Sequence, residues 1–390
     1  MHLFLNCLAA SAGGGLTYLR NIVPEITKCP ELNCTIAVHS DLHEPIQASS
    51  NVSFLHPDAP CNAARRFYWE QQHLFELVRK SGADVLISTG NFALRRSPIP
   101  QILLSGNSLY VSADYSRDLI KRDDYGMWLD NRIRAYFARR SIHWSENTVA
   151  PSQAFANQLR DWTGCPVQAI HHGFSPEIFF ADNTPLPDLI QEKLRAKNDV
   201  LRLLFVSHYN YYRNFETLLR GVALIKKHLR KLKVNLFLTC TFRKEENPGS
   251  FDPSSARRLI NELDLDDTVV ELGTVPYHHL HKLYKACHTY VTAAYAETFA
   301  HPLVEAMACG LPIVASDLPV HREIAGEAAC YFPVFSPEAF ADQVLELARS
   351  PETQSLKSDA GRRRASEFSW RRHLVSLLKL ASTLAKPSRA

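Results

Sequence analysis

The chain has 390 residues, of which 46% are apolar, 22% charged and 10% aromatic, and its formal net charge is +4. This composition excludes a disordered chain, and 44 basic against 40 acidic residues is unlike a dedicated nucleic-acid binder. No window approaches the roughly 18 consecutive apolar residues of a membrane-spanning helix. At about 100–200 residues per domain, the length indicates two or three domains.

Two successive arrays of alternating strands and helices are predicted. In the first, strands are expected at Leu3–Cys7, Thr35–Val38, Val85–Ser88, Gln101–Leu104, Thr148–Ala150 and Val167–Ile170. The clearest helices between them are Thr17–Thr27, Ala63–Lys80 and Gln153–Trp162. A polar, proline-bearing connection, Ala181–Asn198, follows this array.

The second array has the same character. Its strands are expected at Leu201–Val206, Val234–Leu238, Val269–Leu272, Thr289–Val291 and Ile313–Ala315. Its helices are expected at Phe215–His228, Ser254–Leu263, His278–Cys287, Pro302–Cys309 and Pro337–Ala348. Short apolar strands that alternate with helices are typical of parallel sheets covered on both faces. We therefore expect an α/β protein with two doubly wound, Rossmann-like domains facing across a cleft, and ligands outside the carboxyl ends of the strands.

The nine cysteines are scattered and contain no C-x-x-C pair. That pattern is neither a disulfide framework nor a zinc spacing, and it favours a reducing compartment. Leu3–Ala10 has the length of a signal-peptide core, but Asn6 interrupts it and no Lys or Arg precedes it. We expect a cytoplasmic protein, at the inner face of the membrane if it contacts one.

The sharpest local pattern is the run 295–312, which contains a short helix. Pro302 suits a first helical position, where its missing N–H costs nothing. The backbone N–H groups of Phe299, Ala300 and His301 are therefore expected to lie free at a helix N-terminus. Such a terminus is a ready anion site.

Two carboxylates flank that anion site. Glu297 precedes the helix, and Glu305 lies one turn into it among apolar neighbours. A carboxylate on an apolar helix is costly unless it is paired. The two are well placed to accept hydrogen bonds from sugar or ribose hydroxyls, and replacing Glu297 is expected to reduce turnover much more than folding. The alternative, which the spacing leaves open, makes Glu305 a solvated residue and Glu297 a helix-start acid.

Two further segments follow the first strand of each array. After Leu201–Val206 come Ser207, His208 and Arg213, whose guanidinium can grip a diphosphate bidentately, with His208 as an added donor. The alternative is an ordinary surface arginine near a helix cap. After the first strand, Gly13-Gly14-Gly15 allows close approach of a ligand, but it is not G-x-G-x-x-G and is often only a tight turn.

Several of these segments resemble one family. The run E-T-F-A-H-P-L-V-E-A-M-A-C-G-L-P-I-V-A-S-D, from Glu297 to Asp317, resembles the E-x7-E region of retaining glycosyltransferases of family 4, in glycosyl transferases group 1, which have the GT-B fold. Likeness extends to 149–152 with 171–179, to the nucleoside-base loop at 272–276, and to the start of the closing helix at 368–370.

The resemblance implies transfer of a sugar from a nucleotide-sugar donor with retention at the anomeric carbon. Glu297 matches the acid that contacts donor-sugar hydroxyls, and Glu305 the acid that binds ribose hydroxyls. Phe299 and Ala300 match backbone donors around the sugar and diphosphate, and Val275 falls where the base is held.

The resemblance also implies a domain plan. It places an N-terminal acceptor domain at 1–180 and a C-terminal nucleotide-sugar donor domain at 181–368, with a C-terminal helix at about 369–390 packed back onto the first. Gly14 and Gly15 match the point where the N-terminal domain approaches the phosphates and acceptor.

Three departures from the family pattern affect the site. Ser207-His208 and Arg213 stand where Gly-Arg and Lys are usual, so a neutral His208 weakens the diphosphate clamp while Arg213 keeps its charge. Asn107 must supply the catalytic hydrogen bond that the family often takes from a histidine. Ala300 stands where glycine is common. These departures affect the donor and the rate more than the reaction class, and Glu297, Arg213 and Asn107 are the expected catalytic residues.

No metal or other cofactor is expected, because cationic side chains and helix-end amides stabilise the leaving diphosphate. Asp264-Leu265-Asp266 is a D-x-D string, interpreted as a solvated turn. His278-His279-x-His281 is interpreted as structural, because no acidic partner has metal-site spacing.

The expected partners are a nucleotide-sugar donor and a glycan or lipid-linked acceptor, with no nucleic acid. Arg65–Trp69 and Arg132–Trp144 combine arginines with aromatic residues. Each can meet a lipid phosphate or an anionic membrane surface, or be a half-buried helix whose arginines reach water. An epimerase of the same fold and a catalytically degenerate assembly partner are the alternative functions. A phosphorylase is disfavoured, since neither Glu297–Glu305 nor Ser207–Arg213 contains the cofactor-binding lysine.

Overall fold

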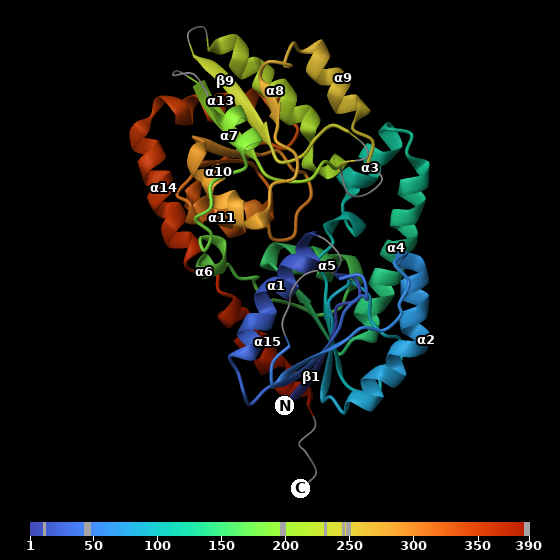
Figure 1. Ribbon diagram of the computed structural model, residues 1–390. Coiled ribbons are helices and arrows are strands. Elements are labelled where there is room, and N and C mark those ends of the chain that lie inside the picture. The colour runs from blue at the N-terminus through green and yellow to red at the C-terminus, as the bar shows by residue number, and fades with distance from the viewer. Residues whose placement is uncertain are drawn as a thin grey trace. The chain divides into compact units, whose positions relative to one another are not determined.

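The computed structural model describes residues 1–10, 13–42, 48–195, 200–229, 232–243, 246 and 251–385. Contacts divide the chain into two compact units, drawn in Figure 1. The N-terminal unit comprises Met1–Ser112, Leu119–Gly173 and Ser369–Ala390, and the C-terminal unit comprises Ala113–Asp118 and Phe174–Phe368. The chain passes from the first unit to the second after Gly173, whereas the expected boundary was at 180/181.

A parallel sheet of seven strands forms the centre of the N-terminal unit, in the order β3-β2-β1-β4-β5-β6-β7. The strands are β1 His2–Asn6, β2 Asn33–Ala37, β3 Val52–Leu55, β4 Val85–Ser88, β5 Gln101–Leu104, β6 Asn147–Ala150 and β7 Val167–Ala169. The six predicted strands are confirmed, each shifted by no more than about two residues. β3 was not predicted, because this short edge strand carries only one fully buried residue, Val52.

The helices of this unit cover both faces of its sheet. They are α1 Gly13–Thr27, α2 Ala63–Ser81, α3 Ala113–Lys121, α4 Tyr125–Trp144, α5 Gln153–Thr163 and α15 Trp370–Leu384, with α3 divided between the two units. Successive side chains of a strand point to opposite faces. In β1, Leu3 and Leu5 belong to the core under α1 and α15, whereas Phe4 belongs to the core under α2.

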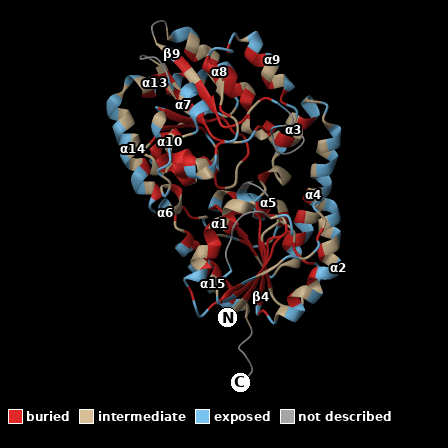
Figure 2. Cartoon of the chain, in the orientation of Figure 1, coloured by how far each residue is buried: buried red, intermediate tan, exposed pale blue. Residues whose placement is uncertain are grey.

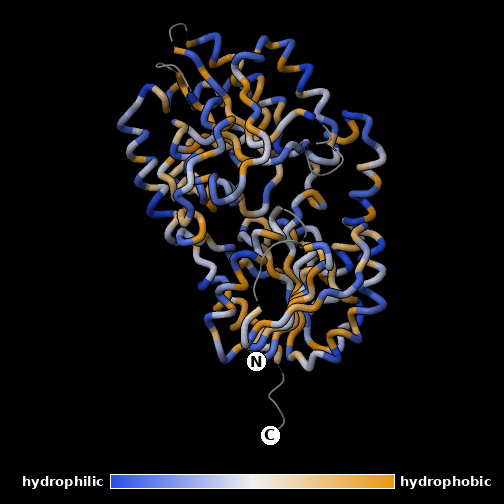
Figure 3. Tube along the Cα trace, in the orientation of Figure 1, coloured by the Kyte–Doolittle hydropathy of each residue, from blue (hydrophilic) through white to orange (hydrophobic). Residues whose placement is uncertain are grey.

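Burial follows the same layering. Figure 2 shows the strands in the colour of buried residues and the outer faces of the helices in the colour of exposed ones. Figure 3 shows the strands as hydrophobic segments of the trace. The alternation of short apolar strands with amphipathic helices therefore produced the expected buried parallel sheets.

The last described helix, α15, returns the chain to the N-terminal unit and lies beside α1 in Figure 1. His373 anchors it, because its Nδ1 donates to the carbonyl of His171 (2.9 Å) and its Nε2 accepts from the Tyr18 hydroxyl (3.1 Å). Trp370 stacks on His172 with ring centroids 5.4 Å apart. A Cβ on Gly173 would lie 2.0 Å from the backbone nitrogen of Trp370, so only glycine fits there.

The buried His373 makes stability depend on pH. Burial lowers the pKa of His373 from 6.5 to about 4. As the pH falls, His373 is therefore protonated in the unfolded chain before it is protonated in the folded protein. The stability that the neutral, buried His373 contributes is complete above pH 6.5 and is lost between pH 6.5 and 4. We expect the wild type to lose about 2–3 kcal/mol more free energy of unfolding between pH 7 and 4.5 than His373→Gln. Urea unfolding at both pH values measures this, and equal losses in the two proteins would contradict it.

A second parallel sheet forms the centre of the C-terminal unit, in the order β10-β9-β8-β11-β12-β13. The strands are β8 Val200–Phe205, β9 Lys233–Leu238, β10 Val269–Glu271, β11 Thr289–Thr292, β12 Ile313–Ser316 and β13 Ala329–Phe332. The helices are α6 Pro176–Phe179, α7 Asp188–Leu194, α8 Phe215–His228, α9 Ser254–Glu262, α10 Leu280–Ala286, α11 His301–Ala308, α12 Pro319–Ala325, α13 Pro337–Arg349 and α14 Pro351–Ala365.

The second array is confirmed in its predicted strands and helices, and it contains elements that the sequence did not indicate. These are β13, α12, α14 and, within the expected connection at 181–198, the helix α7. Residues 196–198 of that connection lie outside the described part of the chain. Helices α8 and α13 approach closely at Gly221, where a Cβ would lie 2.2 Å from the Phe340 ring.

Candidate functional site

The candidate site lies at the point where the strand order of the second sheet reverses. β8 and β11 are neighbours in the sheet, although two strands separate them in the sequence. The segment after β8 carries Ser207, His208 and Arg213, and the segment after β11 carries Glu297. In open α/β sheets, ligands bind outside the carboxyl ends of the strands at such a reversal.

Arg213 and Glu297 form an ion pair at this point, between Nη1 and Oε2. Their side chains are only 17% and 11% exposed. Glu297 Oε1 also accepts the backbone N–H of Thr298 (3.0 Å), and the Arg213 guanidinium lies 5.1 Å from the Tyr212 ring centre. The structure therefore brings together the cation and the carboxylate that the sequence had placed on separate segments.

The pair is charged on both sides at neutral pH. Burial alone would raise the pKa of Glu297, but Arg213 and the Thr298 amide lower it, and the net shift is downward. Burial opposes the charge of Arg213 too, yet Glu297 and the neighbouring Tyr212 and Tyr290 hydroxyls raise its pKa overall. Nε of Arg213 is buried and has no hydrogen-bond partner in the described part of the chain.

Glu305 is buried within α11, where only 6% of the residue is exposed. The alternative that it is a solvated surface residue is therefore wrong. Its Oε2 accepts the hydroxyl of Tyr284 (2.8 Å). Burial raises the pKa of Glu305 to about 7, and the Tyr284 hydrogen bond opposes this shift.

The start of α11 has an unusual backbone. The helix begins at His301, one residue before the expected Pro302, and no side chain caps it. Ala300 adopts φ 62° and ψ 63°, the left-handed conformation that favours glycine. Phe299, just before it, is buried, with its ring 5.5 Å from that of Phe368. The family's common glycine at this position therefore has a conformational reason.

Ala300 makes a stability prediction possible. A left-handed alanine costs about 1–2 kcal/mol, from which the greater chain entropy of an unfolded glycine must be subtracted. We expect Ala300→Gly to raise the free energy of unfolding by about 0.5–1 kcal/mol. Chemical denaturation of the two proteins tests this. Ala306→Gly, within the same helix, is the control and should be destabilising.

Three other predicted site residues are placed in the same unit. The turn at Ser207 is fixed to the end of β9, because its N–H donates to Thr239 Oγ1 (3.0 Å). His208 is exposed, and partial burial together with the Arg213 charge lowers its pKa, so it is neutral at pH 7. Val275 is buried in the loop after β10, which turns at Gly273 with φ 74°.

Sequence reasoning missed His321. It follows β12 at the start of α12 and is fully buried. Its Nδ1 lies 2.8 Å from the carbonyl oxygen of Ser316, which can only accept, so the proton sits on Nδ1. Nε2 is then a buried acceptor without a partner among the described residues. Burial lowers the pKa of His321. The charge of Arg213 lowers it further, and the charge of Glu297 opposes the shift. A lone histidine in a short helix gives no sequence signal of this.

The remaining predicted residues belong to the N-terminal unit. Gly14 and Gly15 lie in the first turn of α1, where a Cβ on Gly15 would come within 3.1 Å of Ala10. Ser11 and Ala12, the start of that glycine-rich segment, lie outside the described residues. Asn107 caps a short 3-10 helix, Ser108–Tyr110, by accepting the N–H of Leu109 (3.0 Å). Its side-chain oxygen therefore has a structural task in addition to the expected catalytic one.

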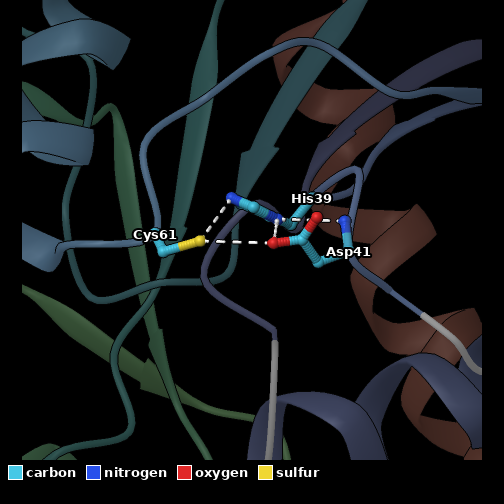
Figure 4. A group of neighbouring side chains, drawn as sticks. All are labelled: His39, Asp41 and Cys61. Atoms are coloured by element: carbon cyan, nitrogen blue, oxygen red, sulfur yellow. Dashed lines mark hydrogen bonds and ion pairs between the residues drawn. The ribbon is translucent and has the colours of Figure 1, made fainter.

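Two groups of described side chains could hold a metal ion. In the first, drawn in Figure 4, Cys61 Sγ lies 3.4 Å from both His39 Nε2 and Asp41 Oδ2. The second contains Asp182, His278 and His279, and sequence spacing gave no sign of this acidic neighbour because Asp182 lies far from the histidines along the chain. Lys282 lies 3.9 Å from Asp182 and competes with a cation there.

The D-x-D string is a turn, as expected from the sequence. Asp264 has φ 52° and a 97% exposed side chain, and it pairs with Lys226 (3.2 Å). Lys226 also pairs with Asp267 (2.9 Å). Asp264 thus helps to hold the turn between α9 and β10.

Comparison with solved structures identifies the fold. Sucrose-phosphate synthase from Thermosynechococcus elongatus superposes with a TM-score of 0.78 over 98% of this chain and 99% of that one, at 18% identity. Anabaena HepE in complex with UDP-glucose gives 0.71 over 98% and 100%, at 15% identity. WaaG, a glycosyltransferase involved in lipopolysaccharide biosynthesis, gives 0.70 over 99% and 100%, at 14% identity. The chain therefore has the GT-B fold.

The sequence comparisons point to one family. Residues 188–364 match the family Glycosyl transferases group 1. It is 31% identical over 99 residues to O-antigen chain mannosyltransferase B of Escherichia coli, covering 25% of this chain and 26% of that protein. It is 28% identical over 187 residues to D-inositol 3-phosphate glycosyltransferase of Saccharomonospora viridis, covering 47% and 42%. The chain thus matches less than half the length of these curated relatives.

Among the described residues, no helix combines the length and the hydropathy that crossing a bilayer requires.

Proposed function

We propose that the protein is a retaining glycosyltransferase of family 4, which transfers a hexose from a nucleotide-sugar donor to a hydroxyl of a glycan or lipid-linked acceptor. The observation that carries the proposal is the buried Arg213–Glu297 pair at the strand-order reversal of the second sheet. The match of residues 188–364 to the family Glycosyl transferases group 1 supports it, as does the UDP-glucose bound by the HepE structure of the same fold.

Each side chain has a task in this reaction. The bond between the anomeric carbon and the diphosphate breaks, and negative charge grows on the leaving phosphate oxygen. Arg213 and the amides around Ala300 stabilise that charge. The acceptor oxygen attacks the same face of the sugar, and its proton passes to the leaving phosphate. Retention then needs no protein nucleophile, in contrast to glycosidases with two carboxyl groups about 5–5.5 Å apart.

Binding of the donor falls to the carboxylates and their neighbours. Glu297 accepts hydrogen bonds from sugar hydroxyls. Arg213 and the Thr298 amide orient the two carboxylate oxygen atoms that do so. Glu305 accepts ribose hydroxyls once it is ionised, and Val275 contacts the base. Gly14, Gly15 and Asn107, in the N-terminal unit, are assigned to the phosphates and acceptor. No metal is required, because Arg213 supplies the positive charge.

The proposed reaction also bears on where the protein acts in the cell. We assign the protein to the cytoplasm, which suits its nine free cysteines, with peripheral contact to a membrane where the acceptor is lipid-linked.

The test is nucleoside diphosphate release from UDP-, GDP-, ADP- and dTDP-sugars, with Arg213→Lys as the matched variant because it keeps the charge. Release from one donor, at least about tenfold slower in the variant at equal melting temperature, supports the proposal, because lysine cannot reproduce the guanidinium fork. The panel is repeated with 1 mM EDTA, which should leave the rate unchanged. The proposal would be overturned if no nucleotide raised the melting temperature and no donor gave nucleoside diphosphate. Binding of a nucleotide without release of product favours the degenerate partner.

A further inference from the structure

The two arginine and aromatic stretches of the sequence meet on one cavity of the N-terminal unit. Helices α2 and α4, which carry them, lie side by side in Figure 1, and the rings of Phe67 and Phe137 are 5.0 Å apart. The cavity has a volume of about 640 Å³. Its lining includes three arginines and four aromatic residues, among them Arg95, Arg96, Arg140, Phe67, Phe137 and Trp144.

The wall of this cavity is fixed by specific contacts. Gln71, on α2, accepts the backbone N–H of Arg95 (2.9 Å) and donates to the carbonyl of Ala93 (3.0 Å). Both hydrogen bonds hold the segment that carries Arg95 and Arg96 against α2. Phe67 also contacts Phe92, with ring centroids 5.3 Å apart. The cavity is thus assembled from three segments held together by hydrogen bonds and ring contacts.

The arginines of the cavity lack counter-charges. Arg95, Arg96 and Arg140 are exposed and have no carboxylate partner in the described part of the chain. Other arginines of the same helices differ, since Arg66 lies 3.6 Å from Glu70 and Arg134 2.7 Å from Asp130. Three like charges around one opening raise its positive potential and attract an anion. Guanidinium groups bind phosphate oxygens through paired N–H donors.

We propose that this cavity binds a phosphate-bearing ligand whose remaining part is apolar or planar. The phosphate is held by the three arginines, and the apolar or planar part lies against Phe67, Phe137 and Trp144. The volume lies within the range of about 300–1,000 Å³ that small-molecule sites occupy. A soluble aromatic phosphate and a phospholipid headgroup share this chemistry. The proposal uses the N-terminal unit alone, so it stands or falls independently of the glycosyltransferase assignment.

The experiment compares two triple variants of equal charge. Arg95→Gln/Arg96→Gln/Arg140→Gln removes the cavity arginines, and Arg65→Gln/Arg132→Gln/Arg139→Gln removes three exposed arginines of α2 and α4 that do not line it. Phenyl phosphate binding is measured by calorimetry, with inorganic phosphate as the probe of the anion alone. Flotation with vesicles of phosphatidylcholine, with and without 20% phosphatidic acid, tests the lipid source.

The expected result is binding of phenyl phosphate or of the phosphatidic acid vesicles by the wild type. This binding should weaken at least about tenfold in the cavity variant and less than about twofold in the control variant, since charge-assisted hydrogen bonds are lost only in the first. Binding of phenyl phosphate marks a soluble ligand, and binding of the vesicles alone marks a headgroup. Equal weakening in both variants, or no binding of either probe by the wild type, would overturn the proposal. Because all six arginines are exposed, both variants should melt like the wild type.

Discussion

Glu297→Leu is expected to lower the free energy of unfolding by about 3–5 kcal/mol, because it leaves Arg213 buried without its counter-charge. The double variant Arg213→Met/Glu297→Leu should regain most of that loss, since an apolar pair of similar volume is often as stable as a buried ion pair. The buried pair thus predicts a cost in stability beside the loss of turnover that the sequence led us to expect for Glu297.

Urea unfolding of the wild type, the two single variants and the double variant measures the coupling between the residues. Turnover should be absent from the double variant even where its stability is restored, which separates the role in the reaction from the role in folding. Glu76→Ala is the control, because its pair with Arg79 is exposed to solvent and an exposed ion pair contributes little to stability. Additive losses in the single and double variants would show that the pair contributes no coupling.

Gly173→Ala is expected to destabilise the N-terminal unit by about 3 kcal/mol or more. The added methyl group would lie 2.0 Å from the nitrogen of Trp370 and 2.4 Å from the carbonyl carbon of Ser369. These are backbone atoms, which cannot rotate away as a side chain can. Helix α15 must therefore shift from its packing position against α1. The contacts of His373 with Tyr18 and His171 would then be lost as well.

Gly126→Ala is the matched control for this substitution. Gly126 lies in the first turn of α4, and a Cβ there would meet nothing within 4 Å. The control should be neutral or more stable by up to about 1 kcal/mol, as expected for alanine in a helix. The two variants are compared by chemical denaturation and by limited proteolysis of α15. Unchanged stability and protection of α15 in Gly173→Ala would contradict the prediction.

The sequence was sufficient for the elements whose pattern is local. Leu201–Val206 and Ile313–Ala315 are short apolar runs followed by turn residues, and both proved to be strands within one or two residues. Phe215–His228 carries an apolar stripe and three basic residues in its last turn, and its bounds were correct. β13 was missed because it is an edge strand of only four residues, too short to show a clear period in the sequence.

The candidate site was predictable in its residue types but not in its pairings. Glu297 and Arg213 are 84 residues apart, and only the adjacency of β8 and β11 brings them together. The same holds for Glu305 and Tyr284, which lie on different helices. The cavity of the N-terminal unit needs α2, α4 and the segment around Arg95 at once, so neither stretch revealed it alone.

The position of α15 has a consequence for synthesis of the protein. The core that contains Leu3 and Leu5 includes Leu374 and Leu377, which the ribosome adds only after the whole C-terminal unit. The C-terminal unit can therefore fold while the N-terminal unit still exposes part of its apolar surface. Domains generally fold as units during translation, with the N-terminal one first. Here the order is reversed at the last step, and a ribosome that stalls before Trp370 leaves a nascent chain whose first unit depends on chaperones.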